Sequence, residues 1–146
     1  MCGFLGAYTF KDNIAPWLPK LLQGLERIRH RGPDAGNYVT SESTFSGHRR
    51  LSIIDLRSDA DNPLFSSHVD AHIVFNGEIY NYRDLKASLS QKVDFKTTSD
   101  TEVILEGYLQ EGADFFTKLR GIYAFAVYDY RGRAKKIILA RDPFGN

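Results

Sequence analysis

The chain has 146 residues, of which 42% are hydrophobic and 25% charged, and its formal net charge is +1. This length suits one domain with a sizeable core, and the near-neutral charge argues against a nucleic acid or an anionic membrane as partner. No apolar run approaches the roughly 20 residues of a membrane span, and the N-terminus lacks the layout of a signal peptide. The single cysteine cannot form an internal disulfide, so we expect a cytoplasmic protein.

The first half of the chain predicts a strand, a helix and a β-hairpin. Gly3 and Gly6 interrupt the first apolar run, as in a strand that another group approaches closely. The helix has apolar side chains at helical spacing, at Trp17, Leu21, Leu25 and Ile28. The predicted elements cover residues 2–8 (strand), 16–30 (helix), and 37–43 and 44–56 (hairpin).

The second half predicts strands and helices that complete an α+β domain. A strand from residue 71 runs into an Asn-Gly break, and Ser99 with Glu102 forms a capping box that begins a helix. The strand at 121–130 is apolar at almost every position, which is typical of a strand covered on both faces. The other predicted elements are helices at 82–89 and 99–112, a helical turn at 115–121 and a strand at 134–141.

Cys2 directly follows the initiator methionine, and its thiol has two interpretations. A free cysteine is most often a small buried hydrophobic residue without chemistry. Removal of Met1 would instead expose the α-amino group of Cys2, which titrates near about 7.7–8.0. That amine would serve as a general base for the thiol nucleophile of the same residue. On the cysteine alone, both interpretations stay open.

Asn76 and Gly77 end an apolar strand and form a candidate oxyanion hole. A side-chain amide and a backbone N–H can hold the negative charge that develops on a carbonyl oxygen under attack. Asn-Gly is also the commonest dipeptide of hairpin turns, so a plain turn is the alternative. The polar, helix-like sequence that follows weakens the turn interpretation without excluding it.

Two charged positions suggest a binding site for a small zwitterion. Arg49 and Arg50 lie on a predicted strand, so one can lie in solvent while the other points inward. An inward guanidinium requires an anion and suits a carboxylate, although a structural ion pair is the simpler explanation. Asp100 begins a predicted helix, where it complements the helix dipole or, alternatively, receives a substrate ammonium.

Other chemistries lack their sequence patterns. No Walker loop or dinucleotide fingerprint is present, and a cysteine at position two on a strand does not fit a papain-like protease. The histidines show no metal-ligand spacing and no second cysteine accompanies them, which argues against a zinc site. These histidines are His30, His48, His68 and His72.

Taken in order, these segments resemble the glutaminase domain of class II glutamine amidotransferases, the N-terminal-nucleophile type, and most of all its asparagine synthetase branch. "RGPD", "HRRLSIID" and "NGEIYN" separate this branch from the relatives that make glucosamine phosphate or phosphoribosylamine. The resemblance implies a four-layer α-β-β-α sandwich of the N-terminal-nucleophile hydrolase type. The matching stretches are "MCGFLGAY", "RHRGPDAGNY", "GHRRLSIIDL", "NPLF", "VFNGEIYNYRDLK", "TTSDTEVILEGYLQEG", "LRGIYAFAVYD" and "ARDPFG".

The resemblance also implies roles for matching residues. Cys2 would attack the side-chain amide carbon of glutamine and form a thioester, while Asn76 and the N–H of Gly77 would hold the oxyanion. Glutamate and ammonia would be released, the ammonia for an amidation such as asparagine synthesis. The implied substrate-binding residues are Arg50 for the α-carboxylate, Glu78 and Asp100 for the α-ammonium, and Leu51, Ile53 and Ile54 along the pocket wall.

By the same resemblance, residues 1–146 form a glutaminase domain that is incomplete at its C-terminal end, and the synthetase domain is absent. We therefore expect no cofactor here, because ATP and Mg²⁺ belong to the missing domain. The expected partners are L-glutamine, a synthetase domain in cis or in trans, and in a homodimer a second copy. A retained Met1 would lock the amine of Cys2 in a peptide bond and leave a silent glutamine-binding or regulatory domain.

Overall fold

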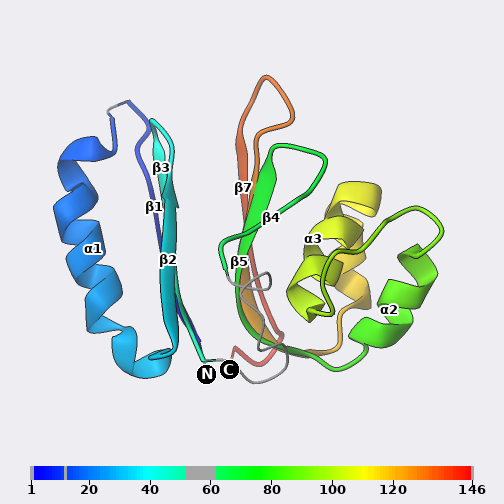
Figure 1. Ribbon diagram of the computed structural model, residues 1–146. Coiled ribbons are helices and arrows are strands. Elements are labelled where there is room, and N and C mark those ends of the chain that lie inside the picture. Colours follow the sequence, from blue (N-terminus) through cyan, green and yellow to red (C-terminus); the bar gives the residue numbers. More distant parts are fainter. Residues whose placement is uncertain (1, 12, 52–61, 146) are drawn as a thin grey trace.

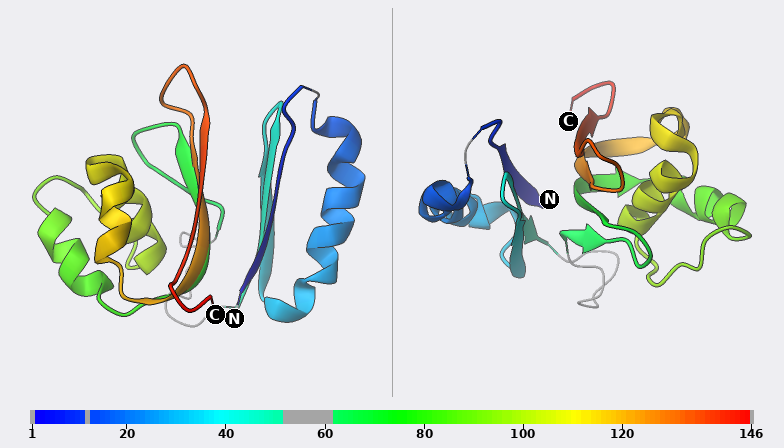
Figure 2. Two further views of the ribbon diagram at one scale, coloured as in Figure 1. Left: turned by 180° about the vertical axis from the view of Figure 1, so that it is seen from behind. Right: turned by 90° about the horizontal axis from the view of Figure 1, so that it is seen from above.

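Two antiparallel sheets face each other at the centre of the molecule, and helices cover the outer face of each (Figure 1). This computed structural model describes residues 2–11, 13–51 and 62–145. The view from above shows the same order of layers, helix, sheet, sheet, helix (Figure 2). The predicted four-layer α-β-β-α sandwich is confirmed.

Sheet A comes from the first third of the chain and has the strand order β1-β3-β2 in the described residues. Its strands and the helical segments beside them are β1 (Gly3–Tyr8), η1 (Ala15–Trp17), α1 (Leu18–Arg27), η2 (Arg29–Arg31), β2 (Ala35–Thr40) and β3 (Thr44–Arg50). These bounds confirm the predicted first strand and the pairing of the hairpin, and they shorten the predicted helix to α1 with a 3-10 turn at each end. The predicted second hairpin strand extends to residue 56, and its part from residue 52 on lies outside the described residues.

Sheet B comes from the rest of the chain and has the strand order β4-β5-β6-β7. Its strands and helices are β4 (Leu64–Phe65), β5 (Ala71–Ile79), α2 (Tyr82–Leu89), α3 (Asp100–Glu111), η4 (Gly112–Lys118), β6 (Gly121–Asp129) and β7 (Lys136–Arg141). The predicted Asn-Gly break is wrong, because β5 stays paired with β6 through Asn76 and Gly77.

The helix α1 packs its apolar stripe on the outer face of sheet A. Leu25 is buried with Phe45 of β3, and Leu21 and Ile28 pack against this core. Trp17 does not join them: its side chain is 53% exposed. Helical spacing therefore identified the packed face of this helix correctly except at its first turn, where Pro16 lies in η1.

The helices α2 and α3 cover sheet B and enclose the larger core. β6 is buried at every position from Phe125 to Asp129, as its apolar sequence predicted. Ser99 caps α3 by accepting a hydrogen bond from the N–H of Thr101. The second half of the predicted capping box is wrong, because the Glu102 carboxylate instead accepts hydrogen bonds from the N–H and hydroxyl of Thr97.

Between the two sheets, apolar packing is interleaved with polar contacts. Side chains of β3 alternate: Phe45 faces α1, whereas Ser46 and His48 reach sheet B. Hydrogen bonds that cross the interface in this way run from Thr44 to Tyr130 (2.8 Å), Ser46 to His72 (2.8 Å), His48 to the carbonyl of Phe75 (2.8 Å), and Tyr128 to the carbonyl of Phe45 (3.3 Å).

Within the described residues, no helix combines the length and the apolar character that crossing a bilayer requires.

Candidate functional site

Cys2 lies at the edge of sheet A, just before β1 and beside the end of β3. The register pairs Gly3 with Arg49, so the preceding residue comes next to Arg50 and Leu51. The Sγ of Cys2 accepts a hydrogen bond from the N–H of Leu51 at 3.3 Å and lies 3.6 Å from its carbonyl oxygen. The thiol is half-buried rather than enclosed in the core. A thiol so placed is accessible to a small substrate.

The backbone of Cys2 is held by an arginine that sequence analysis did not single out. The Nε of Arg31, in η2, donates a hydrogen bond to the carbonyl oxygen of Cys2 at 3.1 Å. Gly3 faces the same segment, because a Cβ there would lie 3.3 Å from side-chain carbons of Arg31 and Ile28. The turn after α1 thus fixes the start of β1.

The adjacent arginines do point to opposite faces, as the strand period predicted. Arg49 points toward α1, where it donates hydrogen bonds to the carbonyl of Leu25 and the carboxylate of Glu26. Its side chain is 17% exposed, so the expectation that one arginine lies in solvent is wrong. Arg50 is 8% exposed and shares the face of His48, toward sheet B. The register of β1 and β3 places Arg50 across from Cys2.

Asn76 and Gly77 lie on β5, whose end meets the N-terminus and the end of β3 at one edge of the sandwich (Figure 1). The side-chain oxygen of Asn76 is buried and has no hydrogen-bond partner among the described residues. An oxyanion would be bound by the Nδ2 of this amide, because an amide oxygen only accepts hydrogen bonds. A side-chain amide donor beside a backbone N–H is the arrangement that an oxyanion hole requires.

The N–H of Gly77 points to the open edge of β5. The backbone N–H groups of β5 point alternately toward β6 and away from it. Phe75 donates its N–H to Asn62 and Ile79 donates its N–H to Asp100, both away from β6. Gly77 lies midway between these two residues and shares their direction. Its φ is +144°, and a Cβ would lie 2.1 Å from the carbonyl oxygen of Ile122. Only glycine fits here, so the position is defined by backbone contact with β6.

Asp100 and Glu78 place negative charge near the end of β5. Asp100 is 5% exposed at the start of α3, and its Oδ2 accepts the N–H of Ile79 at 2.9 Å. Burial raises the pKa of Asp100, the backbone N–H groups of Ile79 and Thr101 lower it, and the charge of Glu78 raises it. Glu78 is exposed. The two carboxyl groups are thus electrostatically coupled at one place, where an ammonium would relieve their repulsion.

Other expectations concern the glycines near Cys2 and the pocket wall. Other groups approach Gly3 and Gly6 closely, as the sequence predicts, and these groups belong to the protein itself: Gly3 packs against η2, and a Cβ on Gly6 would lie 2.7 Å from the hydroxyl of Tyr128. Both glycines serve packing. Ile53 and Ile54 of the expected pocket wall lie outside the described residues.

Sequence reasoning missed two residues near β5, His48 and Asn62. Their side chains bind the carbonyl and the N–H of Phe75, directly before Asn76. His48 could have been found from strand periodicity, since it precedes Arg50 by two residues and so shares its face. No local signal in the sequence pointed to Asn62.

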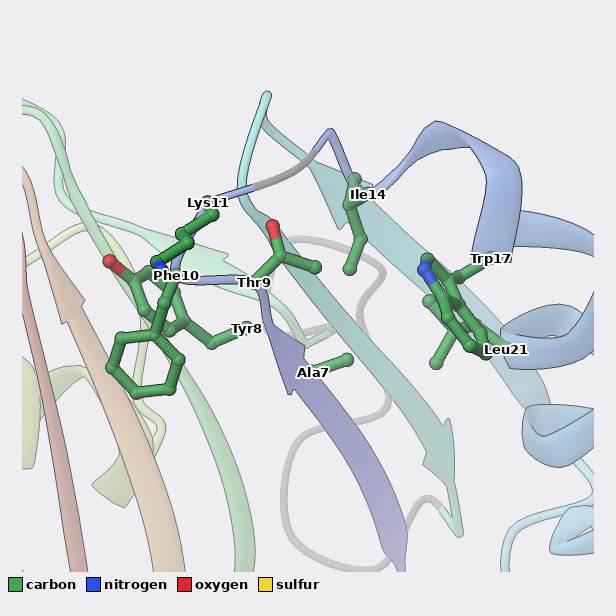
Figure 3. A pocket seen from close by; sticks show the side chains of 8 residues that line it. All are labelled: Ala7, Tyr8, Thr9, Phe10, Lys11, Ile14, Trp17 and Leu21. Carbon is green, nitrogen blue, oxygen red and sulfur yellow. The ribbon is translucent and has the colours of Figure 1, made fainter.

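A surface pocket of about 470 Å³ lies elsewhere, at the opposite end of β1 (Figure 3). Tyr8, Phe10 and Trp17 are among the side chains that line it. β1 spans six residues, so the pocket is about 20 Å from Cys2 at the usual rise of a strand. It is therefore separate from the residues described above. Among the described residues, no three His, Cys, Asp or Glu side chains gather as metal ligands would.

The chain is similar over its whole length to known proteins. The family model described as "Glutamine amidotransferase domain" matches residues 1–146. Relatives include asparagine synthetase B (glutamine-hydrolyzing) of Escherichia coli K12, 36% identical over 145 residues, and asparagine synthetase (glutamine-hydrolyzing) 1 of Bacillus subtilis 168, 40% identical over 149 residues. The alignments cover 99% of this chain but only 26% and 23% of these relatives, so the chain spans about a quarter of their length.

A solved structure shares the fold. The glutamine phosphoribosylpyrophosphate amidotransferase of B. subtilis superposes with a TM-score of 0.74 at 22% sequence identity. The superposition covers 99% of this chain and 38% of that one. The layered architecture of Figure 1 therefore occurs in an amidotransferase of distant sequence.

Proposed function

The chain belongs to the glutamine amidotransferase domain family, and we propose that it hydrolyses the side-chain amide of glutamine and supplies the ammonia to an amidation such as asparagine synthesis. The observation that carries the proposal is the position of the Cys2 thiol, 3.3 Å from the N–H of Leu51 and beside the buried Arg50. A nucleophile next to a buried guanidinium suits a substrate that carries both a carboxylate and a reactive carbonyl.

Glutamine fits the charges around the site. Arg50 would bind the α-carboxylate, and its burial would strengthen that contact by excluding water. Asp100 and Glu78 would bind the α-ammonium, and the raised pKa of Asp100 indicates a site that favours an added positive charge. These residues would fix the head group at two points and leave the side-chain amide free to reach Cys2, with Leu51, Ile53 and Ile54 along the wall.

Cys2 would carry the reaction through a thioester. Once its α-amine is free, that amine takes the thiol proton as Sγ attacks the amide carbon of glutamine. Asn76 and the N–H of Gly77 donate hydrogen bonds to the oxyanion, and each such donor is worth about 10²–10³ in rate. The protonated α-amine of Cys2 then gives its proton to the leaving nitrogen as the C–N bond of glutamine breaks, which gives ammonia and the thioester.

Water completes the cycle. The α-amine takes a proton from the water molecule as its oxygen attacks the thioester carbon. The C–S bond breaks, the thiol regains its proton, and glutamate leaves. A synthetase domain, in cis or in trans, would use the ammonia, as the names of the asparagine synthetase relatives suggest. That this domain would also bind ATP and Mg²⁺ is implied by the family resemblance alone.

The test is glutaminase activity of a sample whose intact mass shows that Met1 has been removed. We expect glutamine-dependent glutamate release, its loss in Cys2→Ala, and labelling of Cys2 by a diazoketone analogue of glutamine. The exposed Thr117 lies in η4, and Thr117→Ala is the matched control that should retain activity.

A Met-free protein that neither releases glutamate nor takes the label would refute the hydrolase. If such a protein still binds glutamine, the domain is a silent glutamine-binding module instead. Activity that survives Cys2→Ala would keep the hydrolysis but refute the thioester.

A further inference from the structure

We propose that His48 is a positioning residue that holds the oxyanion donors of β5 in place from the opposite sheet; this rests on the function proposed above. His48 lies on β3 of sheet A and is 1% exposed. Its Nε2 donates a hydrogen bond to the carbonyl oxygen of Phe75 on sheet B, at 2.8 Å. Phe75 immediately precedes Asn76, so this bond fixes the peptide from which the candidate hole begins.

The open edge of β5 explains why a side chain is needed at this point. In the described residues β4 pairs with β5 only at His72 and Ile73. Two residues further along, none of the described strands pairs with Phe75 on that edge. Its N–H donates a hydrogen bond to Oδ1 of Asn62 at 3.1 Å, and its carbonyl oxygen accepts one from Nε2 of His48. Two side chains therefore replace a missing strand directly before the catalytic segment.

The same residue connects the two halves of the site. His48 and Arg50 share one face of β3, and Leu51 next to them binds the Cys2 thiol. From Phe75 the chain continues to Asn76 and Gly77. The nucleophile and the oxyanion donors lie on different sheets, so their separation depends on contacts that cross the interface. The hydrogen bond of His48 is a crossing contact that joins these two segments directly.

The substitution His48→Phe keeps a ring of similar size and removes the donor. We expect kcat for glutamine to fall about 10- to 100-fold, because displacement of a reacting group by about 1 Å costs about that much. KM should change less than about threefold, since Arg50 and Asp100 are untouched. Alkylation of Cys2 by iodoacetamide, a displacement without an oxyanion, should keep its rate. His48→Gln, whose amide donor reaches a similar point, should recover most of kcat.

Tyr128→Phe is the matched control, because it removes another buried hydrogen bond between the sheets, from Tyr128 to the carbonyl of Phe45. It should lower the melting temperature and leave kcat within about threefold. Equal loss of kcat in both variants, or an unchanged kcat in His48→Phe, would overturn the inference, because His48 would then act only through general packing.

A readout without turnover separates this inference from the proposed function. In ¹⁵N-labelled protein, the amide signal of Gly77 should shift in His48→Phe and stay unchanged in Tyr128→Phe. An unchanged Gly77 signal overturns the positioning role whether or not the protein hydrolyses glutamine. If the wild-type protein is inactive but the Gly77 signal does shift in His48→Phe, the glutaminase is refuted and the positioning of Gly77 by His48 is supported.

Discussion

Acid should destabilise this fold through one histidine buried between the sheets. His72 is 1% exposed, bonded to the Ser46 hydroxyl at 2.8 Å and stacked on the ring of Tyr128 at 4.5 Å. The rings of Phe65 and Tyr130 contact it as well. Desolvation in this surrounding lowers the pKa of His72 from 6.5 to about 4.

The sign and size of the effect follow from proton linkage. Between pH 6.5 and about 4 the unfolded chain binds a proton at His72 that the folded protein does not bind. The free energy of unfolding therefore falls as the pH falls through this window and levels off below it. The full loss is about 3 kcal/mol, and most of it has occurred by roughly pH 4.5. Native domains have about 5–15 kcal/mol in total, so this is a large share.

The assay compares urea unfolding of the wild-type protein and His72→Gln at about pH 7.5 and 4.5. The variant keeps a side chain that can bond to Ser46 but cannot titrate. Other acid-sensitive groups, such as Asp129, whose pKa Arg131 holds well below its usual range, act in both proteins and cancel. The wild type should lose about 2–3 kcal/mol more than the variant. An equal loss would refute the reasoning, as would an NMR titration that gives His72 an ordinary pKa.

Two further predictions concern the candidate site. Gly77→Ala should abolish most glutamine turnover and lower the free energy of unfolding by roughly 1–3 kcal/mol. The reason is that the added Cβ would lie 2.1 Å from the carbonyl oxygen of Ile122. Thermal melting and an activity assay test this, and a variant that is folded and fully active would contradict it. In both the wild type and Asp100→Asn, kcat/KM should fall as the α-amine of Cys2 becomes protonated. In the wild type it should fall more steeply as the pH approaches the pKa of Asp100, which burial raises, because a protonated carboxyl binds the ammonium poorly. Asp100→Asn should have a lower kcat/KM at neutral pH and lack this second fall, and an identical profile shape in the variant would exclude Asp100 as its source.

Individual strands and helices were predictable from local patterns. The alternation along β3 placed Arg49 and Arg50 on opposite faces, and the apolar run of β6 predicted a strand covered on both sides. The four-layer arrangement came from the family resemblance. Such features depend on side chains close in the sequence or on motifs that retain their order, so the chain alone reveals them.

The errors concern contacts between distant segments. The partner of Gly6 is Tyr128, from the other sheet, so nothing near Cys2 in the sequence explains that glycine. β5 continues through Gly77 because β6 supplies the pairing, which overrides the turn preference of Asn-Gly. Glu102 binds Thr97 rather than the N-cap because the chain before α3 folds back on it. His48 was missed for the same reason: its role depends on Phe75.

Because the site is divided between two sheets, its activity should depend on how the two sheets are positioned relative to each other. The thiol belongs to sheet A and the oxyanion donors to sheet B, and polar contacts such as Ser46 to His72 set the spacing. A domain whose sheets slide or separate slightly would keep its strands, its helices and its far-ultraviolet circular dichroism. It would nevertheless lose turnover, so inactivation should precede loss of secondary structure when the protein is mildly heated or acidified.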